Sequence, residues 1–142
     1  MKTVVVYWSG TGNTEAMAGS VAEGAKSAGA EVSVFTAADF SADMVDQFDS
    51  IAFGCPSMGS EQLEDSEFEP MFNACEAKLS GKKVGLFGSY GWGDGEWMRE
   101  WESRMLDAGA NVLNREGLIC HETPDDDALE DCRSLGKQLA SL

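Results

Sequence analysis

The sequence predicts an α/β fold in which an open, five-stranded parallel sheet carries helices on both faces. Short apolar runs alternate with longer amphipathic runs along the chain, which is typical of repeated βα units. The apolar runs are rich in β-branched and aliphatic residues, as fully buried parallel strands are. The length of 142 residues is ordinary for one domain, so we expect a single domain over residues 1–142.

The expected elements follow one another in strict alternation. The strand candidates are Lys2–Trp8, Glu31–Thr36, Ser50–Cys55, Lys83–Gly88 and a broken run over Asn111–Cys120. The helix candidates are roughly Asn13–Ala28, Ala42–Gln47, Ser66–Leu79, Gly95–Ala108 and Pro124–Leu142. Right-handed crossovers between parallel strands are the rule, and strand order 2-1-3-4-5 makes the first, third and fourth strands neighbours.

Residues at the expected helix ends support these assignments. Thr123 and Pro124 read as an N-cap followed by proline at the first helical position, with acidic residues after them. Gly29 and Gly109 each follow a helical run, as glycines at helix C-termini do. The helix over Ala42–Gln47 has the weakest support, because its segment is short and rich in aspartate.

The charge of the chain is strongly negative, with 25 acidic and 10 basic residues and a formal net charge of −15. Nucleic acid and anionic membranes are disfavoured as partners, because binding them requires clusters of Lys and Arg. Basic protein partners are favoured, although charge alone is explained more simply by solubility. The interval between Lys26 and Lys78 contains no Lys or Arg, and it includes an acidic stretch over residues 61–69.

Other composition features point to a cytoplasmic protein. No stretch approaches the ~20 apolar residues of a membrane span, and the N-terminus shows no secretion signal. The four cysteines have no paired spacing, so we expect reduced and mostly buried thiols. The single histidine, His121, is expected to be structural or exposed, and no cluster has metal-ligand spacing.

Three polar, glycine-containing loops follow the first, third and fourth strand candidates. The first loop consists of Ser9, Gly10, Thr11, Gly12, Asn13 and Thr14, and it leads directly into a helix. Its backbone N–H groups, its hydroxyls and the helix N-terminus form an anion site that suits a terminal phosphate. A P-loop would require Gly-Lys-Ser/Thr, and a dinucleotide fingerprint would require Gly in place of Glu15. A plain Ser/Thr-rich turn is the structural alternative.

The second loop covers residues 54–61 and the third covers residues 88–95. In an open parallel sheet, ligands bind beyond the carboxyl ends of the strands, so the three loops should share one site. The third loop places Tyr90 and Trp92 among four glycines, where aromatic rings can stack on a flat ligand. The alternative is that these rings fold back onto the domain. Trp97 and Trp101, four residues apart on one helix face, are explained by packing.

The combination SGTGNT, MGSE and GSYGWGDG resembles the short-chain flavodoxins, and the similarity extends over essentially the whole chain. The long-chain insertion in the fifth strand is missing. The resemblance implies FMN, with its phosphate held by Ser9, Thr11, Gly12, Asn13 and Thr14. It implies that Met58 and Trp92 flank the isoalloxazine, that Gly59 faces N5 and that Glu61 bonds N3–H. The expected site further includes Gly10, Pro56, Ser57, Ser60, Ser89, Tyr90, Gly91 and Gly93. Ser60 and Pro56 stand where some members carry Asp and a hydroxyl residue.

The function implied by the resemblance is that of a monomeric, non-enzymatic, low-potential one-electron carrier between redox partner proteins. The semiquinone/hydroquinone couple would be used, with a peptide flip at Gly59 on reduction. Repulsion from Glu61, Glu64, Asp65 and Asp94 would lower the second potential, and the same acidic rim would steer partners. A quinone reductase on the same fold and a cofactor-free interaction protein are the alternatives. Short loops disfavour the first, and intact phosphate and stacking loops disfavour the second.

Overall fold

A computed structural model describes residues 1–113 and 117–141 of the chain. Its sheet contains the strands β1 (Lys2–Tyr7), β2 (Glu31–Thr36), β3 (Ser50–Gly54), β4 (Lys83–Tyr90), β5 (Asn111–Val112) and β6 (Leu118–His121). All pairings are parallel, and the order β2-β1-β3-β4-β5 confirms the expected topology. The broken fifth strand is two short strands, because β6 pairs with the far half of β4 while β5 pairs with its start.

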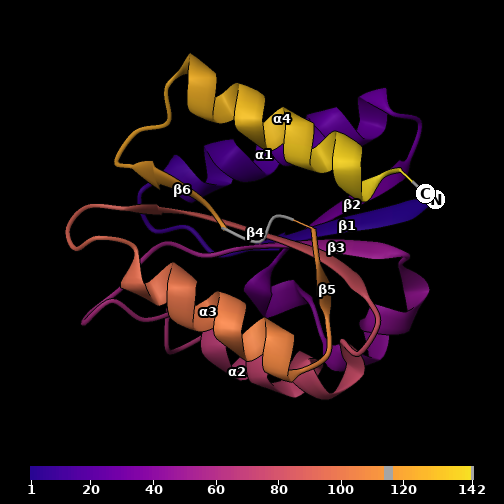
Figure 1. The fold of residues 1–142 in the computed structure, drawn as a ribbon, viewed down its shortest axis with the longest axis horizontal. Helices are drawn as coiled ribbons and strands as arrows, with labels where there is room; N and C mark the ends of the chain where they lie inside the picture. The colour runs from indigo at the N-terminus through magenta and orange to yellow at the C-terminus, as the bar shows by residue number, and fades with distance from the viewer. Residues whose placement is uncertain (114–116, 142) are drawn as a thin grey trace.

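Both faces of the central strands are buried, which explains their continuous apolar sequence. Successive residues of β1 point to opposite faces, so that Val4 and Val6 join one core cluster while Val5 joins the other. All three are fully buried. The helices α1 (Asn13–Ser27) and α4 (Asp126–Leu139) cover one face, and α2 (Phe68–Cys75) and α3 (Glu96–Asp107) cover the other (Figure 1).

Two of the expected helices differ from the structure. The segment Ala42–Gln47 forms a 3₁₀-helix, η2, and not an α-helix. The shorter segment before it, η1 (Ala37–Asp39), is a 3₁₀-helix as well. Such a short segment gains few i→i−4 bonds to offset helix nucleation. The helix expected over Ser66–Leu79 is divided into α2 and a 3₁₀ turn, η3 (Glu76–Lys78).

The start of α4 lies two residues later than the sequence predicts. Asp125, and not Thr123, is the N-cap, and its carboxylate accepts a bond of 2.8 Å from the backbone N–H of Ala128. Pro124 therefore precedes the helix and is not its first residue. The C-terminal glycines are confirmed, because Gly29 and Gly109 follow the last residues of α1 and α3 with positive φ.

The first and last helices pack with their backbones in direct contact. A Cβ at Gly136 would lie 2.0 Å from the carbonyl oxygen of Val21, and one at Gly24 would lie 1.9 Å from that of Arg133. At the end of α4, the Leu139 carbonyl accepts a bond of 2.8 Å from the buried Ser50 hydroxyl, where β3 begins. The last helix is thereby attached to the end of the sheet where its strands begin.

An aromatic cluster joins α2 and α3 beneath the sheet. Phe68 and Phe72 each meet Trp101 edge to face, with ring centroids 5.4 and 5.7 Å apart. The Arg104 guanidinium lies 4.9 Å from the centroid of Phe72. Trp97 and Trp101 are both 1% exposed, so the expected packing role is confirmed. No helix in the described parts of the chain is long and apolar enough to cross a membrane.

Candidate functional site

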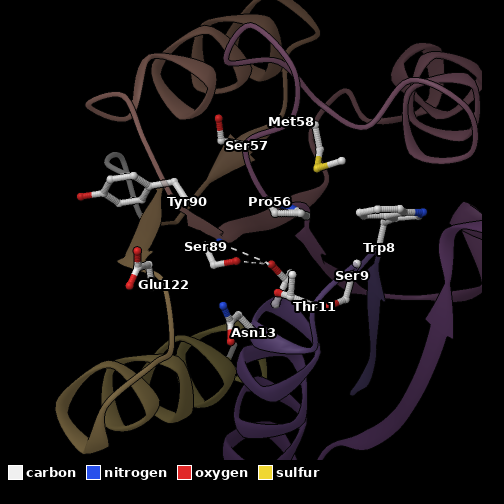
Figure 2. Close-up of a pocket in the computed structure, with 13 residues that line it drawn as sticks. Trp8, Ser9, Thr11, Asn13, Pro56, Ser57, Met58, Ser89, Tyr90 and Glu122 are labelled. Carbon is white, nitrogen blue, oxygen red and sulfur yellow. Dashed lines mark hydrogen bonds between the residues drawn. The ribbon is translucent and has the colours of Figure 1, made fainter.

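A cavity of about 430 Å³ opens where β1, β3 and β4 end (Figure 2). It is lined by Trp8, Ser9, Gly10, Thr11, Asn13, Thr14, Pro56, Ser57, Met58, Ser89, Tyr90, Gly91 and Glu122. All three predicted loops contribute to its wall, so their expected convergence at one edge of the sheet is confirmed. The wall contains no Lys or Arg among the residues that the structure describes.

The first loop presents an anion site at the start of α1. Gly12 has φ +97°, a conformation that glycine adopts at little cost, and it supplies no side chain to cap the helix. The Ser9 hydroxyl oxygen accepts bonds from the N–H groups of Gly12 (3.1 Å) and Glu15 (3.3 Å). Its own proton remains available for donation. An anion in front of α1 would therefore meet a hydroxyl donor and the positive end of the helix dipole.

A buried pair of hydroxyls ties the first loop to β4. Thr14 Oγ1 and Ser89 Oγ lie 2.9 Å apart, with the two residues 1% and 5% exposed. The N–H of Ser89 also donates to Thr14 Oγ1 at 3.4 Å. The Thr14 hydroxyl is thus engaged in holding the cavity floor together, in addition to lining it.

The second loop is anchored by the buried residue Cys55, through hydrogen bonds to its carbonyl and its sulfur. Its carbonyl accepts a bond from the Trp97 indole N–H (3.1 Å), and its sulfur accepts one from the Glu64 N–H (3.4 Å). Cys55 is fully buried, which confirms the expected burial of this thiol, and burial raises the pKa of the Cys55 thiol far above its ordinary value. Beyond it, Ser57 N–H donates to the Ser89 carbonyl at 3.0 Å.

The tip of the second loop is a tight turn. Met58 and Gln62 exchange backbone bonds of 2.8 and 2.9 Å, and between them Gly59 and Glu61 have φ +55° and +51°. The Met58 side chain is 37% exposed, and Figure 2 shows its thioether hanging toward Pro56 and Trp8. A large apolar side chain therefore stands free at the mouth of the cavity.

The third loop separates its two aromatic residues. The Tyr90 ring packs between Trp97 and His121, at centroid distances of 5.6 and 5.1 Å, so this ring folds back onto the domain while it lines the cavity. His121 Nε2 lies 3.2 Å from the Gly91 carbonyl and thus contacts the loop. Trp92 is 61% exposed and lies outside the cavity wall.

The acidic residues expected near the ring have different environments. Asp94 is exposed and pairs with Arg99 at 3.0 Å. Glu64, in contrast, is 5% exposed, and its carboxylate accepts the N–H groups of residues 66–68 at the start of α2. Burial raises the pKa of Glu64, but bonds from the Ser66 hydroxyl and these N–H groups outweigh it and lower the pKa below 4.5. Glu64 is therefore a helix cap and not part of the exposed rim.

Most of the residues predicted to bind the cofactor lie in the cavity wall. Eleven of the predicted residues line the cavity: Ser9, Gly10, Thr11, Asn13, Thr14, Pro56, Ser57, Met58, Ser89, Tyr90 and Gly91. Six lie in the same loops but outside the wall: Gly12, Gly59, Ser60, Glu61, Trp92 and Gly93. Two wall residues were missed. Trp8 directly precedes the first loop, and Glu122 follows β6, so both stand at carboxyl ends of strands, where they could have been sought.

Two comparisons with known proteins agree with this geometry. Residues 5–136 match the protein family described as flavodoxin. The chain is 52% identical to a flavodoxin from Megasphaera elsdenii over 136 residues, which cover 96% of both chains. It is 47% identical to a flavodoxin from Clostridium beijerinckii over 138 residues, which cover 97% of this chain and 99% of that one.

Solved structures give the same result. The solution structure of two-electron reduced Megasphaera elsdenii flavodoxin superposes with a TM-score of 0.87 at 51% identity, covering 97% of this chain and 98% of that one. A flavodoxin from the domain Archaea superposes with the same TM-score at 29% identity, covering 99% and 96% of the two chains.

Proposed function

This chain belongs to the flavodoxin family, and from that premise we propose that the cavity between its three loops is the FMN site. The protein is an FMN-binding electron carrier and not an enzyme. The observation that carries the proposed location is the convergence of all three loops on one cavity, with the N-terminus of α1 at its edge.

The residues present fit the phosphorylated end of FMN. The start of α1, whose N-cap residue Gly12 has no side chain, and the Ser9 hydroxyl can bind the phosphate without a Lys or Arg. Thr11 and Asn13 line the same part of the wall and supply further donors (Figure 2). We assign the phosphate to this end of the cavity, with Gly12 and Thr14 shaping the loop around it.

The other end of the cavity fits the planar ring. Met58, in the cavity wall, and Trp92, on the third loop outside it, are large apolar side chains that are exposed, and burying them against a ring would remove apolar surface from water. FMN, when bound, supplies one-electron redox chemistry. We propose that Gly59 and Glu61 contact the pyrimidine side of the ring and that residues 90–93 close its opposite edge.

Electron transfer to and from redox partner proteins follows from the family. We propose that partners dock at an acidic rim from which the capping residue Glu64 is removed and to which Glu122 of the cavity wall is added. The rim then consists of Glu61, Asp65, Asp94 and Glu122. The net charge of −15 favours basic partners, and complementary fields raise the encounter rate. We further propose that the carrier works as a monomer, as a single domain over residues 1–142, and in the cytoplasm.

A direct test is titration of the apoprotein with FMN while the flavin fluorescence is followed. We expect quenching that saturates at one FMN per chain, because the ring becomes enclosed by aromatic and thioether groups. Unchanged flavin fluorescence and an unchanged visible spectrum would overturn the assignment of the cavity. A second arm adds NADH and a quinone without any reductase, and slow or absent turnover is the expected result for a carrier.

A further inference from the structure

The Glu61 side chain connects two loops that are far apart in the sequence. Its Oε1 accepts bonds from the backbone N–H groups of Gly95 (3.2 Å) and Glu96 (3.1 Å). These N–H groups belong to the start of α3, whose N-cap residue, Gly95, has no side chain to cap the helix. The second loop therefore supplies the cap for a helix that begins more than thirty residues later.

Gly93 closes over this carboxylate from the other side. A Cβ at Gly93 would lie 2.4 Å from both Cδ and Oε1 of Glu61, and the residue has φ +86°. Both the space and the backbone conformation therefore require glycine. The Glu61 carboxylate is enclosed between the tip of the third loop and the start of α3, and it is not simply an acid on the surface.

The backbone of Glu61 is held in position by the turn of the second loop. Glu61 has φ +51°, which is unfavourable for a residue with a side chain and costs on the order of 1 kcal/mol. The paired backbone bonds between Met58 and Gln62 hold the turn in place. In this conformation the Glu61 carboxylate accepts two charge-assisted hydrogen bonds from the start of α3, and these bonds offset the cost of the backbone conformation.

We propose that Glu61 is a positioning residue that clamps the third loop to the second, so that the loops carrying Met58 and Trp92 open and close together. The clamp is a property of the protein alone. Its consequence for the cofactor rests on the proposed function, because the two clamped loops would have to separate before the ring could leave.

The first test measures hydrogen exchange of the Gly95 and Glu96 amides in the FMN-loaded protein, together with the rate of FMN release. In Glu61→Ala, both amides lose their acceptor, and we expect their exchange to be about tenfold faster. Glu61→Gln keeps an oxygen acceptor and should restore part of the protection. Glu96→Gln is the matched control, because it removes one charge at the same helix end without removing the Glu61 acceptor.

The outcomes separate this inference from the proposed function. Faster FMN release in Glu61→Ala with unchanged amide exchange would mean that Glu61 acts only as a contact to the flavin, and the clamp would be refuted. Equal exchange in Glu61→Ala and Glu96→Gln would also refute it. If the wild-type chain takes up no FMN, the proposed function fails, while the same exchange comparison made on the chains without FMN still reports on the clamp.

A double-mutant cycle provides an independent check. Gly93→Ala should displace the Glu61 carboxylate and increase amide exchange on its own, in part through backbone strain at residue 93. Added to Glu61→Ala, it should increase exchange by a smaller factor than it does in the wild type, because the carboxylate is no longer there to displace. Fully multiplicative effects of the two substitutions would contradict a shared contact.

Discussion

Replacing Glu64 with glutamine should destabilise the protein more than any other charge removal in the second loop or the turn after it. The Glu64 carboxylate accepts backbone bonds of 2.9, 2.8 and 2.8 Å from Ser66, Glu67 and Phe68. It also accepts a bond from the Ser66 hydroxyl. A glutamine retains one oxygen but turns an NH₂ group toward donors, so at least one N–H at the start of α2 loses its partner.

The expected loss of stability follows from the two roles of the Glu64 carboxylate, which are to cap α2 and to place a negative charge at its N-terminus. Losing a helix cap costs about 0.5–2 kcal/mol, and losing a negative charge near a helix N-terminus costs about 0.3–1 kcal/mol more. Because Glu64 is almost fully buried, water cannot replace the missing acceptor. We expect a loss of about 2 kcal/mol, which corresponds to a urea midpoint lower by about 1 M for a slope of about 2 kcal/mol/M.

The assay is urea unfolding at a fixed, saturating FMN concentration, since a bound ligand itself adds stability. The pKa of Glu64 is lowered in the folded protein, so its contribution is fully present above its ordinary value of 4.5. That contribution is lost as the pH falls through the lowered folded pKa. The difference between wild type and Glu64→Gln should therefore be constant near pH 7 and shrink below pH 4.5.

The control is Asp65→Asn, which removes one charge from the exposed neighbouring residue. It should change stability by less than about 0.5 kcal/mol, as substitutions on the surface usually do. The reasoning is refuted if Glu64→Gln and Asp65→Asn have the same midpoint at pH 7. It is refuted as well if the deficit of Glu64→Gln persists undiminished at pH 3.

Three further predictions address the phosphate end, the helix contact and partner docking. Ser9→Ala should raise the Kd for FMN about tenfold by removing one hydroxyl donor, measured by fluorescence titration, and riboflavin affinity should change much less. Gly136→Ala should lower the free energy of unfolding by about 1–3 kcal/mol, because the added Cβ meets the Val21 carbonyl. Gly19→Ala, where the added Cβ has open space, should raise the free energy of unfolding by about 0.5–1 kcal/mol. Reduction by a basic partner reductase should slow as salt is added, and a rate independent of ionic strength would argue against the acidic rim.

The sheet was predictable because its determinants are local. Buried parallel strands appear in the sequence as apolar runs. The loops after β1, β3 and β4 are polar and contain glycine, which is typical of ligand-binding loops at the carboxyl ends of strands. The helix pattern failed where a local side chain competes with the helix for backbone N–H groups. Residues 66 and 67 suit a helix, but the Glu64 side chain takes their N–H groups as a cap, so α2 starts at Phe68.

The sequence was sufficient to predict which loops form the site. It was less informative about which side chains in those loops contact one another. Nothing in the spacing of Glu61 indicates that its carboxylate bonds Gly95 and Glu96, because that depends on how two loops approach each other in space. The same holds for Glu122, which reaches the cavity only because β6 pairs with β4. Trp92 remains outside the cavity wall in the structure, so its role beside the ring stays a prediction.

The attachment of α4 to the start of β3 has a practical consequence for work with this carrier. The start of β1 and the end of α4 lie at the edge of the sheet where the strands begin (Figure 1), while the cavity lies where β1, β3 and β4 finish. The six residues of β1 place about 20 Å between these edges. A reporter, an electrode tether or a fused reductase attached before β1 or after α4 would therefore leave the proposed electron-exchanging edge unobstructed, and a flexible linker would have to reach around the sheet to bring a fused partner to that edge.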